Sequence, residues 1–145
     1  MAYDFQVAVD CERPHELASW WADTLGWQFE EQDEDFIRRM IAEGYADATE
    51  TTTYKGRLAW TSGASIRHPD GPASGPRKRV LFQQVPESKT VKNRVHLDVW
   101  VGQDNVAAKT AELISRGASF LHEADQGPHH WVTLADPEGN EFCIS

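Results

Sequence analysis

The sequence predicts an α+β fold built from two tandem βαβββ modules. Three observations support this prediction: a strand–helix–strand pattern that occurs twice, a turn containing Pro and Gly that follows each copy, and a short strand after each turn. A duplicated unit explains this order better than chance. We therefore expect a single domain over residues 1–145, with module one at 1–87 and module two at 92–145.

The first module begins with a short β-branched segment, residues 5–10, which is typical of a strand. Pro14 suits the first turn of a helix, and Gly26 is a natural helix end. Between them the apolar residues recur at helical spacing: Leu17, Trp20, Trp21 and Leu25. Residues 27–30 then predict a second strand.

The second module repeats this order from residue 94. Residues 94–101 predict a strand, Asp104 or Asn105 can cap the next helix, and Gly117 ends it before a strand at 118–122. The predicted apolar stripe of this helix consists of Val106, Thr110, Leu113 and Ile114.

The later halves of the modules correspond as well. His-Pro-Asp-Gly at 68–71 and Asp-Pro-Glu-Gly at 136–139 are both turn formers. Strands are expected after them, at 80–85 and 140–144. Aligning their phenylalanines pairs Gln83 with Cys143.

One stretch of module one has no counterpart. Apolar residues at steps of three or four predict an extra amphipathic helix near 33–45, and residues 47–53 and 71–76 have the composition of loops. The helix is either a lid, with Arg38 and Arg39 toward an anionic ligand, or it packs against the sheet or at a dimer contact.

Composition narrows the possible partners. A formal charge of -9 and a pI near 5.0 argue against nucleic acid or an anionic membrane as the main partner. No apolar run approaches the roughly 18 residues of a spanning helix, and the N-terminus has no signal-peptide pattern. Two cysteines fit reduced thiols in the cytoplasm. We expect a soluble, acidic, cytoplasmic domain.

Four strings carry a family resemblance: LGW at 25–27, VPE at 85–87, KNRVHLD at 92–98 and DPEGNEFC at 136–143. They resemble the glyoxalase-like branch of the vicinal oxygen chelate superfamily, which includes glyoxalase I and the bleomycin-resistance proteins. The resemblance covers the chain except 33–53. It implies a curled, partly closed mixed sheet around a ligand-binding cup, and a homodimer.

The resemblance also implies four metal-ligand places, on the first and last strand of each module. They fall here on Gln6, on Gln83 (or Gln84 if the register slips by one), on His96 and on Cys143. Amide oxygens are weak donors without charge, and the family's usual glutamates are missing. We expect no metal cofactor. The alternative is an improvised site for Zn, Ni, Mn or Fe to which Asp98 adds a carboxylate.

His96 is the candidate catalytic residue. It is expected either to donate to or accept from a ligand oxygen or to act as a general base, unless it is a structural histidine. Trp100 shares its strand parity, and His130 or Trp131 either touches the ligand or packs across strands. The predicted ligand-binding residues are Gln6, Gln83, His96, Asp98, Trp100, Trp131 and Cys143.

These features predict a protein that binds a small organic ligand in its cup without the standard metal site. The first alternative is a metal- or histidine-dependent lyase or isomerase of the glyoxalase type, acting on a small oxygenated metabolite. The second is an interaction module whose cup is filled by its own side chains.

Overall fold

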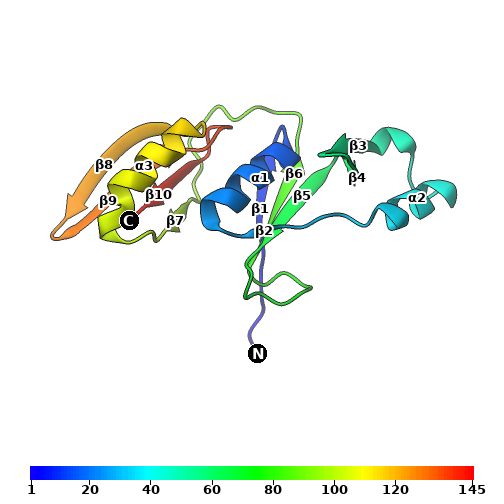
Figure 1. The fold of residues 1–145 in the computed structure, drawn as a ribbon, viewed down its shortest axis with the longest axis horizontal. Helices are drawn as coiled ribbons and strands as arrows, with labels where there is room; N and C mark the ends of the chain where they lie inside the picture. The colour runs from blue at the N-terminus through cyan, green and yellow to red at the C-terminus, as the bar shows by residue number, and fades with distance from the viewer. The chain divides into compact units, whose positions relative to one another are not determined.

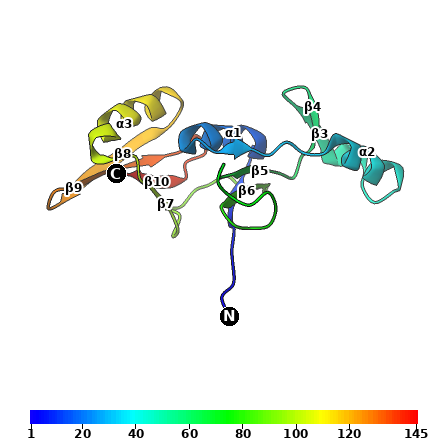
Figure 2. The same cartoon turned by 60° about the horizontal axis from the view of Figure 1, so that its bottom comes forward.

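A computed structural model describes residues 1–145 (Figures 1 and 2). The chain divides into two compact units, Met1–Glu87 (unit 1) and Ser88–Ser145 (unit 2). With three α-helices and ten strands in mixed sheets, it has the predicted α+β class. That the two units form one domain stays a prediction.

Unit 1 holds the larger set of elements. They are β1 (Val7–Cys11), α1 (Pro14–Leu25), β2 (Gln28–Phe29), α2 (Glu34–Ala42), a 3₁₀ turn (Ala48–Glu50), β3 (Thr51–Tyr54), β4 (Arg57–Trp60), β5 (Gly63–Arg67) and β6 (Arg79–Gln84). Unit 2 consists of β7 (Leu97–Val99), a 3₁₀ turn (Gln103–Asn105), α3 (Val106–Ser115), β8 (Ser119–Gln126), β9 (His129–Ala135) and β10 (Glu141–Ile144).

The two units have the same sheet topology. The strand orders are β1-β6-β5-β2 and β7-β10-β9-β8, so in each the first strand pairs with the last. That pair is parallel, and the other two pairs are antiparallel. The duplicated βαβββ prediction is therefore confirmed, and each four-stranded sheet is open rather than closed on itself.

The register supports the alignment of the last strands and changes that of the first. Phe82 lies opposite Val9, and Phe142 lies opposite Leu97, so the two phenylalanines occupy matching places. Counting back one residue from these partners, the place that matches His96 is Ala8. Gln6 lies two residues earlier, just outside β1.

Helix α1 covers one face of the unit 1 sheet, against β5 and β6 (Figure 1). Its predicted stripe is confirmed for Leu17, Trp20 and Trp21, which are buried, whereas Leu25 at the end of the helix is half-buried. They pack over a sheet face that includes Phe82, which is only 1% exposed. The helix ends at Gly26, whose φ of 66° lies in the left-handed region that favours glycine.

Helix α3 packs on β8 and β9 in unit 2. Val106 and Leu113 are buried as predicted, and Phe142 of β10 is only 1% exposed. Ile114 departs from the prediction: it is 44% exposed, because the ten-residue helix buries only a narrow stripe. On β10 the buried Phe142 and Ile144 alternate with Glu141 and Cys143, and on β9 Thr133 lies between Val132 and Leu134. The sheet therefore has a more polar face away from α3.

The extra helix is present and α2 packs beside β4 (Figure 2). Asp33 caps it by accepting a hydrogen bond from the Phe36 amide at 3.0 Å, and Ile37 is its one buried residue. The loop prediction for 47–53 is wrong in its later part, because residues from Thr51 onward pair with β4. Their β-branched side chains favour a strand, which a tight turn at 55–56 then reverses.

Candidate functional site

The polar face of the unit 2 sheet is hollowed. The unit 2 hollow has a volume of about 440 Å³ and is lined by side chains from β8, β9, β10 and residues 92–100. Five of the seven predicted ligand-binding residues line it: His96, Asp98, Trp100, Trp131 and Cys143. The other two, Gln6 and Gln83, belong to unit 1. The binding roles of all seven stay predictions.

His96 and Asp98 form the most polar part of the unit 2 hollow. His96 Nδ1 lies 2.9 Å from Asp98 Oδ1, and the two side chains are 40% and 62% exposed. They are two residues apart, so an extended backbone points both to one face. A carboxylate oxygen can only accept, so Nδ1 carries the proton and the Nε2 lone pair of the neutral ring stays free. His96 can therefore accept a hydrogen bond or a proton at Nε2.

Cys143 approaches this pair from β10. Its place between the buried Phe142 and Ile144 points the thiol to the opposite face, where Sγ lies 3.3 Å from Thr133 Oγ1. One ligand atom each from His96, Asp98 and Cys143 all lie within 4.8 Å of one another. Imidazole, carboxylate and thiolate are donors that Zn²⁺ accepts, so these three residues fit a divalent ion.

The remaining aromatic residues extend the hollow. Trp100 follows β7 and is 88% exposed, and Trp131 lies beside His129 with ring centroids 5.7 Å apart. Of the adjacent histidines, His129 lines the hollow, whereas His130 Nδ1 lies 2.7 Å from Asp125 Oδ1. Alternation along β9 separates them, as expected for neighbours on a strand.

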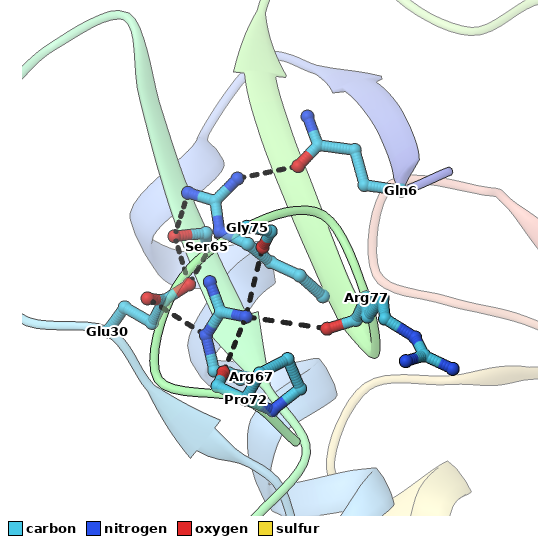
Figure 3. A network of polar contacts seen from close by, with 8 residues as sticks. Gln6, Glu30, Ser65, Arg67, Pro72, Gly75 and Arg77 are labelled. Carbon is cyan, nitrogen blue, oxygen red and sulfur yellow. Dashed lines mark hydrogen bonds and ion pairs between the residues drawn. The ribbon is translucent and has the colours of Figure 1, made fainter. Parts of the chain in front are cut away.

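Gln6 takes part in a different structure, a polar network within unit 1 (Figure 3). Its side-chain oxygen accepts a hydrogen bond from Arg79 Nη1 at 2.8 Å. Gln83 is exposed on β6, where its backbone carbonyl lies 3.6 Å from Cys11 Sγ. Gln84, the alternative, donates to the Glu12 carbonyl at 3.4 Å. The oxygen that Gln6 would offer a metal is therefore already bonded to an arginine.

Glu30 is the anion of this unit 1 network. It accepts from Arg79 Nε at 2.7 Å and from Arg67 Nε at 3.3 Å, and Ser65 Oγ donates to it at 3.1 Å (Figure 3). Burial raises the pKa of Glu30, but the hydrogen bond and charge of Arg79, with help from Ser65 and Arg67, hold that pKa below its ordinary value. The network was missed from the sequence, although two arginines that face each other on β5 and β6 need an anion.

Arg67 fastens the loop between β5 and β6 to this network. Its Nη1 donates to the carbonyls of Pro72, Gly75 and Arg77 at 3.0 to 3.4 Å (Figure 3). Arg67 itself is buried. A cation that ties three carbonyls and a carboxylate together gives this loop a defined conformation.

A second ion pair holds the edge of the unit 2 hollow. Lys89 Nζ lies 2.8 Å from Glu141 Oε1, and the Asn93 amide donates to the other oxygen at 3.1 Å. Burial raises the pKa of Glu141, but Lys89 and the backbone hydrogen bonds outweigh it and lower that pKa. The charge of Glu141 is therefore neutralised by Lys89. Asp98, the other carboxylate of the unit 2 hollow, has only His96 as its ion-pair partner.

Residues 6–145 match the family model of the glyoxalase-like domain. The chain belongs to this family. Several solved structures have a fold similar to that of this glyoxalase-like chain. The fosfomycin resistance protein FosX from Listeria monocytogenes is 7% identical and superposes with a TM-score of 0.63, covering 99% of this chain and 92% of FosX.

Two further structures show the same fold. A glyoxalase/bleomycin resistance protein/dioxygenase family enzyme from Burkholderia phytofirmans is 14% identical with a TM-score of 0.60, covering 96% of this chain and 94% of its own. FosX complexed with Mn(II) and sulfate is 6% identical with a TM-score of 0.61, covering 99% and 91%. No curated protein sequence matches the glyoxalase-like chain. None of its helices is long and apolar enough to cross a membrane.

Proposed function

We propose that this glyoxalase-like protein binds a small organic ligand in the unit 2 hollow. The observation that carries the proposal is Trp100, a large aromatic side chain that is 88% exposed at the rim of a hollow of about 440 Å³. Small-molecule pockets have volumes of roughly 300–1,000 Å³ and combine aromatic walls with a few polar groups. Trp100 and Trp131 supply the walls, and His96 with Asp98 supplies the polar group.

The net charge of the chain and the Asp98 carboxylate favour a cationic ligand; Lys92 also lines the hollow and donates to the Asn93 carbonyl at 3.1 Å. The chain has a formal charge of -9, and the Asp98 carboxylate is paired with His96 rather than with a lysine or arginine. A ligand cation beside Asp98 also comes within reach of tryptophan rings, whose faces attract positive charge. Binding then needs no metal: the ligand is held by ring contacts and by hydrogen bonds at His96. We further propose that the protein acts in the cytoplasm as a homodimer.

A thermal-shift screen of cationic aromatic compounds, with bleomycin as the named first probe, tests the binding proposal. Trp100→Ala should weaken binding of every hit by about five- to thirtyfold, because ring contacts with a cation are worth roughly 1–2 kcal/mol. Tyr45→Ala is the matched control, since Tyr45 is also exposed, at 78%, but lies in unit 1. Hits whose affinity is unchanged by both Trp100→Ala and Trp131→Ala would contradict the proposal.

One observation favours a second candidate function, a lyase or isomerase acting on a small oxygenated metabolite. His96, Asp98 and Cys143 bring three metal-binding donor types within 4.8 Å. These residues would hold the ion, which when bound would polarise a substrate oxygen. Without a metal, Asp98 holds the His96 proton on Nδ1 and leaves Nε2 free to remove a proton from substrate.

Metal analysis distinguishes the candidates. Protein purified without an affinity tag and equilibrated with Zn²⁺ or Mn²⁺ should retain one ion per chain if the enzyme candidate is correct. Cys143→Ser should then lower Zn²⁺ retention, and Cys11→Ala, at the other thiol, should not. Retention of no ion together with ligand binding supports the metal-free binder. The third alternative, an interaction module with a filled cup, predicts neither ligand binding nor retention of an ion.

A further inference from the structure

A second pocket lies in unit 1, where the inserted hairpin meets helix α1. The insertion pocket has a volume of about 180 Å³, and its walls come from α1, β2, β3, β4 and the turn between β3 and β4. Unit 2 has no equivalent of this hairpin, because its chain passes from α3 through β8 directly to β9. The insertion pocket is therefore a feature of this chain's insertion rather than of the repeated βαβββ unit.

Three rings form an aromatic wall in the insertion pocket. The His15 and Tyr54 rings have centroids 5.2 Å apart, Phe29 and Tyr54 are 5.8 Å apart, and His15 and Phe29 are 6.4 Å apart. All three pairs are tilted, by 31° to 41°. Offset and tilted contacts are the arrangements that aromatic rings prefer, so a further planar ring can join this cluster.

His15 has a buried acceptor that nothing satisfies. Its side chain is only 5% exposed, and Nε2 lies 2.8 Å from the Trp60 carbonyl oxygen. Because a carbonyl can only accept, Nε2 carries the proton, and Nδ1 of the neutral ring is a bare lone pair. That Nδ1 is shielded from solvent and has no hydrogen-bond partner. Buried polar atoms are satisfied in the great majority of cases, so this one needs an explanation.

The other polar groups around the insertion pocket are already engaged in building it. Gln32 donates to the Gly63 carbonyl at 2.8 Å and accepts from the Trp60 amide at 2.7 Å. The Tyr54 hydroxyl lies 2.8 Å from Ser19 Oγ. These bonds fix the walls. Arg57 pairs with Glu31 at 3.5 Å, and Lys55 Nζ lies 5.4 Å from the centroid of the Tyr54 ring. His15 Nδ1 is therefore the lining atom that is buried without a hydrogen-bond partner.

We propose that the insertion pocket is a second binding site, which takes a small planar aromatic compound carrying a hydroxyl or N–H donor. The donor would hydrogen-bond to His15 Nδ1 while the ring lies against Phe29 and Tyr54. Because Nδ1 is shielded from solvent, a side chain of the pocket wall has to move when the ligand binds. The size is suitable, since an apolar cavity of about 150 Å³ admits a benzene ring. This site is independent of the unit 2 hollow, and its occupant need not be the ligand proposed there.

Phenol and toluene are the probes that test this site, because they have similar shapes and only phenol has a donor. Titration calorimetry on the full chain should show phenol binding about tenfold more tightly than toluene, the effect of one hydrogen bond to a buried acceptor. His15→Phe should abolish the preference. Trp100→Ala, in the unit 2 hollow, should leave phenol affinity unchanged, so the two proposed sites can fail separately.

A variant at His15 also loses the bond to Trp60, so two further measurements keep the test valid. Leu58→Trp narrows the insertion pocket from β4 with His15 intact and should remove binding of both probes. In the native chain, the ¹⁵N resonance of His15 Nδ1 should shift on addition of phenol and stay in place with toluene. Equal affinities for the two probes, or an Nδ1 resonance that phenol does not move, would overturn the proposal and indicate an acceptor that the fold leaves unsatisfied.

Discussion

Replacing Glu30 by Gln should destabilise unit 1 in a pH-dependent way. Glu30 joins Arg67 and Arg79, whose side chains are only 10% and 23% exposed, and Glu30 itself is 29% exposed. Glutamine keeps one acceptor oxygen but removes the charge, so two nearly buried guanidinium groups face an amide. Breaking a fully buried pair costs roughly 3–5 kcal/mol, and partial exposure reduces this to about 2 kcal/mol at neutral pH.

The pH dependence follows from the direction of the pKa shift. The pKa of Glu30 lies below its ordinary value of 4.5 in the folded chain, so its contribution to stability is fully present above that pH. It is lost as the pH falls through the folded pKa, because protonation discharges the native carboxylate. The difference between the native protein and Glu30→Gln should therefore be largest at neutral pH and shrink well below pH 4.5.

Urea unfolding followed by tryptophan fluorescence measures the difference in free energy of unfolding between the native chain and Glu30→Gln. In thermal unfolding, a loss of about 2 kcal/mol corresponds to a melting-temperature decrease of about 8 °C for a chain of this size. Asp35→Asn is the matched control, because Asp35 is fully exposed and pairs with Arg38 at 3.9 Å. It should leave the unfolding midpoint unchanged. A Glu30→Gln variant as stable as the native chain at neutral pH, or a difference that grows in acid, would refute the reasoning.

Four further substitutions have expected outcomes that follow from hydrogen bonding, packing and backbone geometry. Arg67→Lys cannot donate to the same set of carbonyls, so limited proteolysis should cleave the 68–78 loop faster than in the native chain. Phe142→Ala should lower the free energy of unfolding by about 3–5 kcal/mol, whereas the half-exposed Phe120→Ala should cost under about 1 kcal/mol, both measured by urea unfolding. Gly26→Ala should lower the free energy of unfolding by about 1 kcal/mol, because alanine disfavours the φ of 66° at this position. An added Cβ meets nothing within 4 Å, so no steric clash contributes. An unchanged stability in thermal unfolding would contradict this expectation.

The repeated architecture was predictable because its signals are local. Helical spacing, glycine at helix ends and the two Pro-containing turns each depend on a few neighbouring residues, and they occur in the same order twice. The alignment of Phe82 in module one with Phe142 in module two followed from that repetition. The hairpin was missed because its first strand, from Thr51, adjoins an acidic 3₁₀ turn and has no alternating apolar pattern.

The candidate site was predictable only in part, because its contacts join distant residues. That His96, Asp98 and Cys143 share a face follows from strand alternation and a parallel pair. By contrast, Gln6 is bonded to Arg79, 73 positions later in the chain, and no local pattern signals such a bond. The unsatisfied nitrogen of His15 also depends on distant partners, since Trp60 lies 45 positions away.

The inserted segment also bears on how unit 1 folds. Its parallel pair joins Val7 to Val80, whereas the equivalent pair of unit 2 joins Leu97 to Phe142 over a shorter stretch of chain. The entropy of closing a loop grows only with the logarithm of its length, so the longer connection costs about 0.4 kcal/mol more. A segment that adds so little to the closure cost can change in length and sequence while the sheet around it stays the same. The insertion is thus a position at which a pocket can be gained or lost while the sheet of unit 1 is kept.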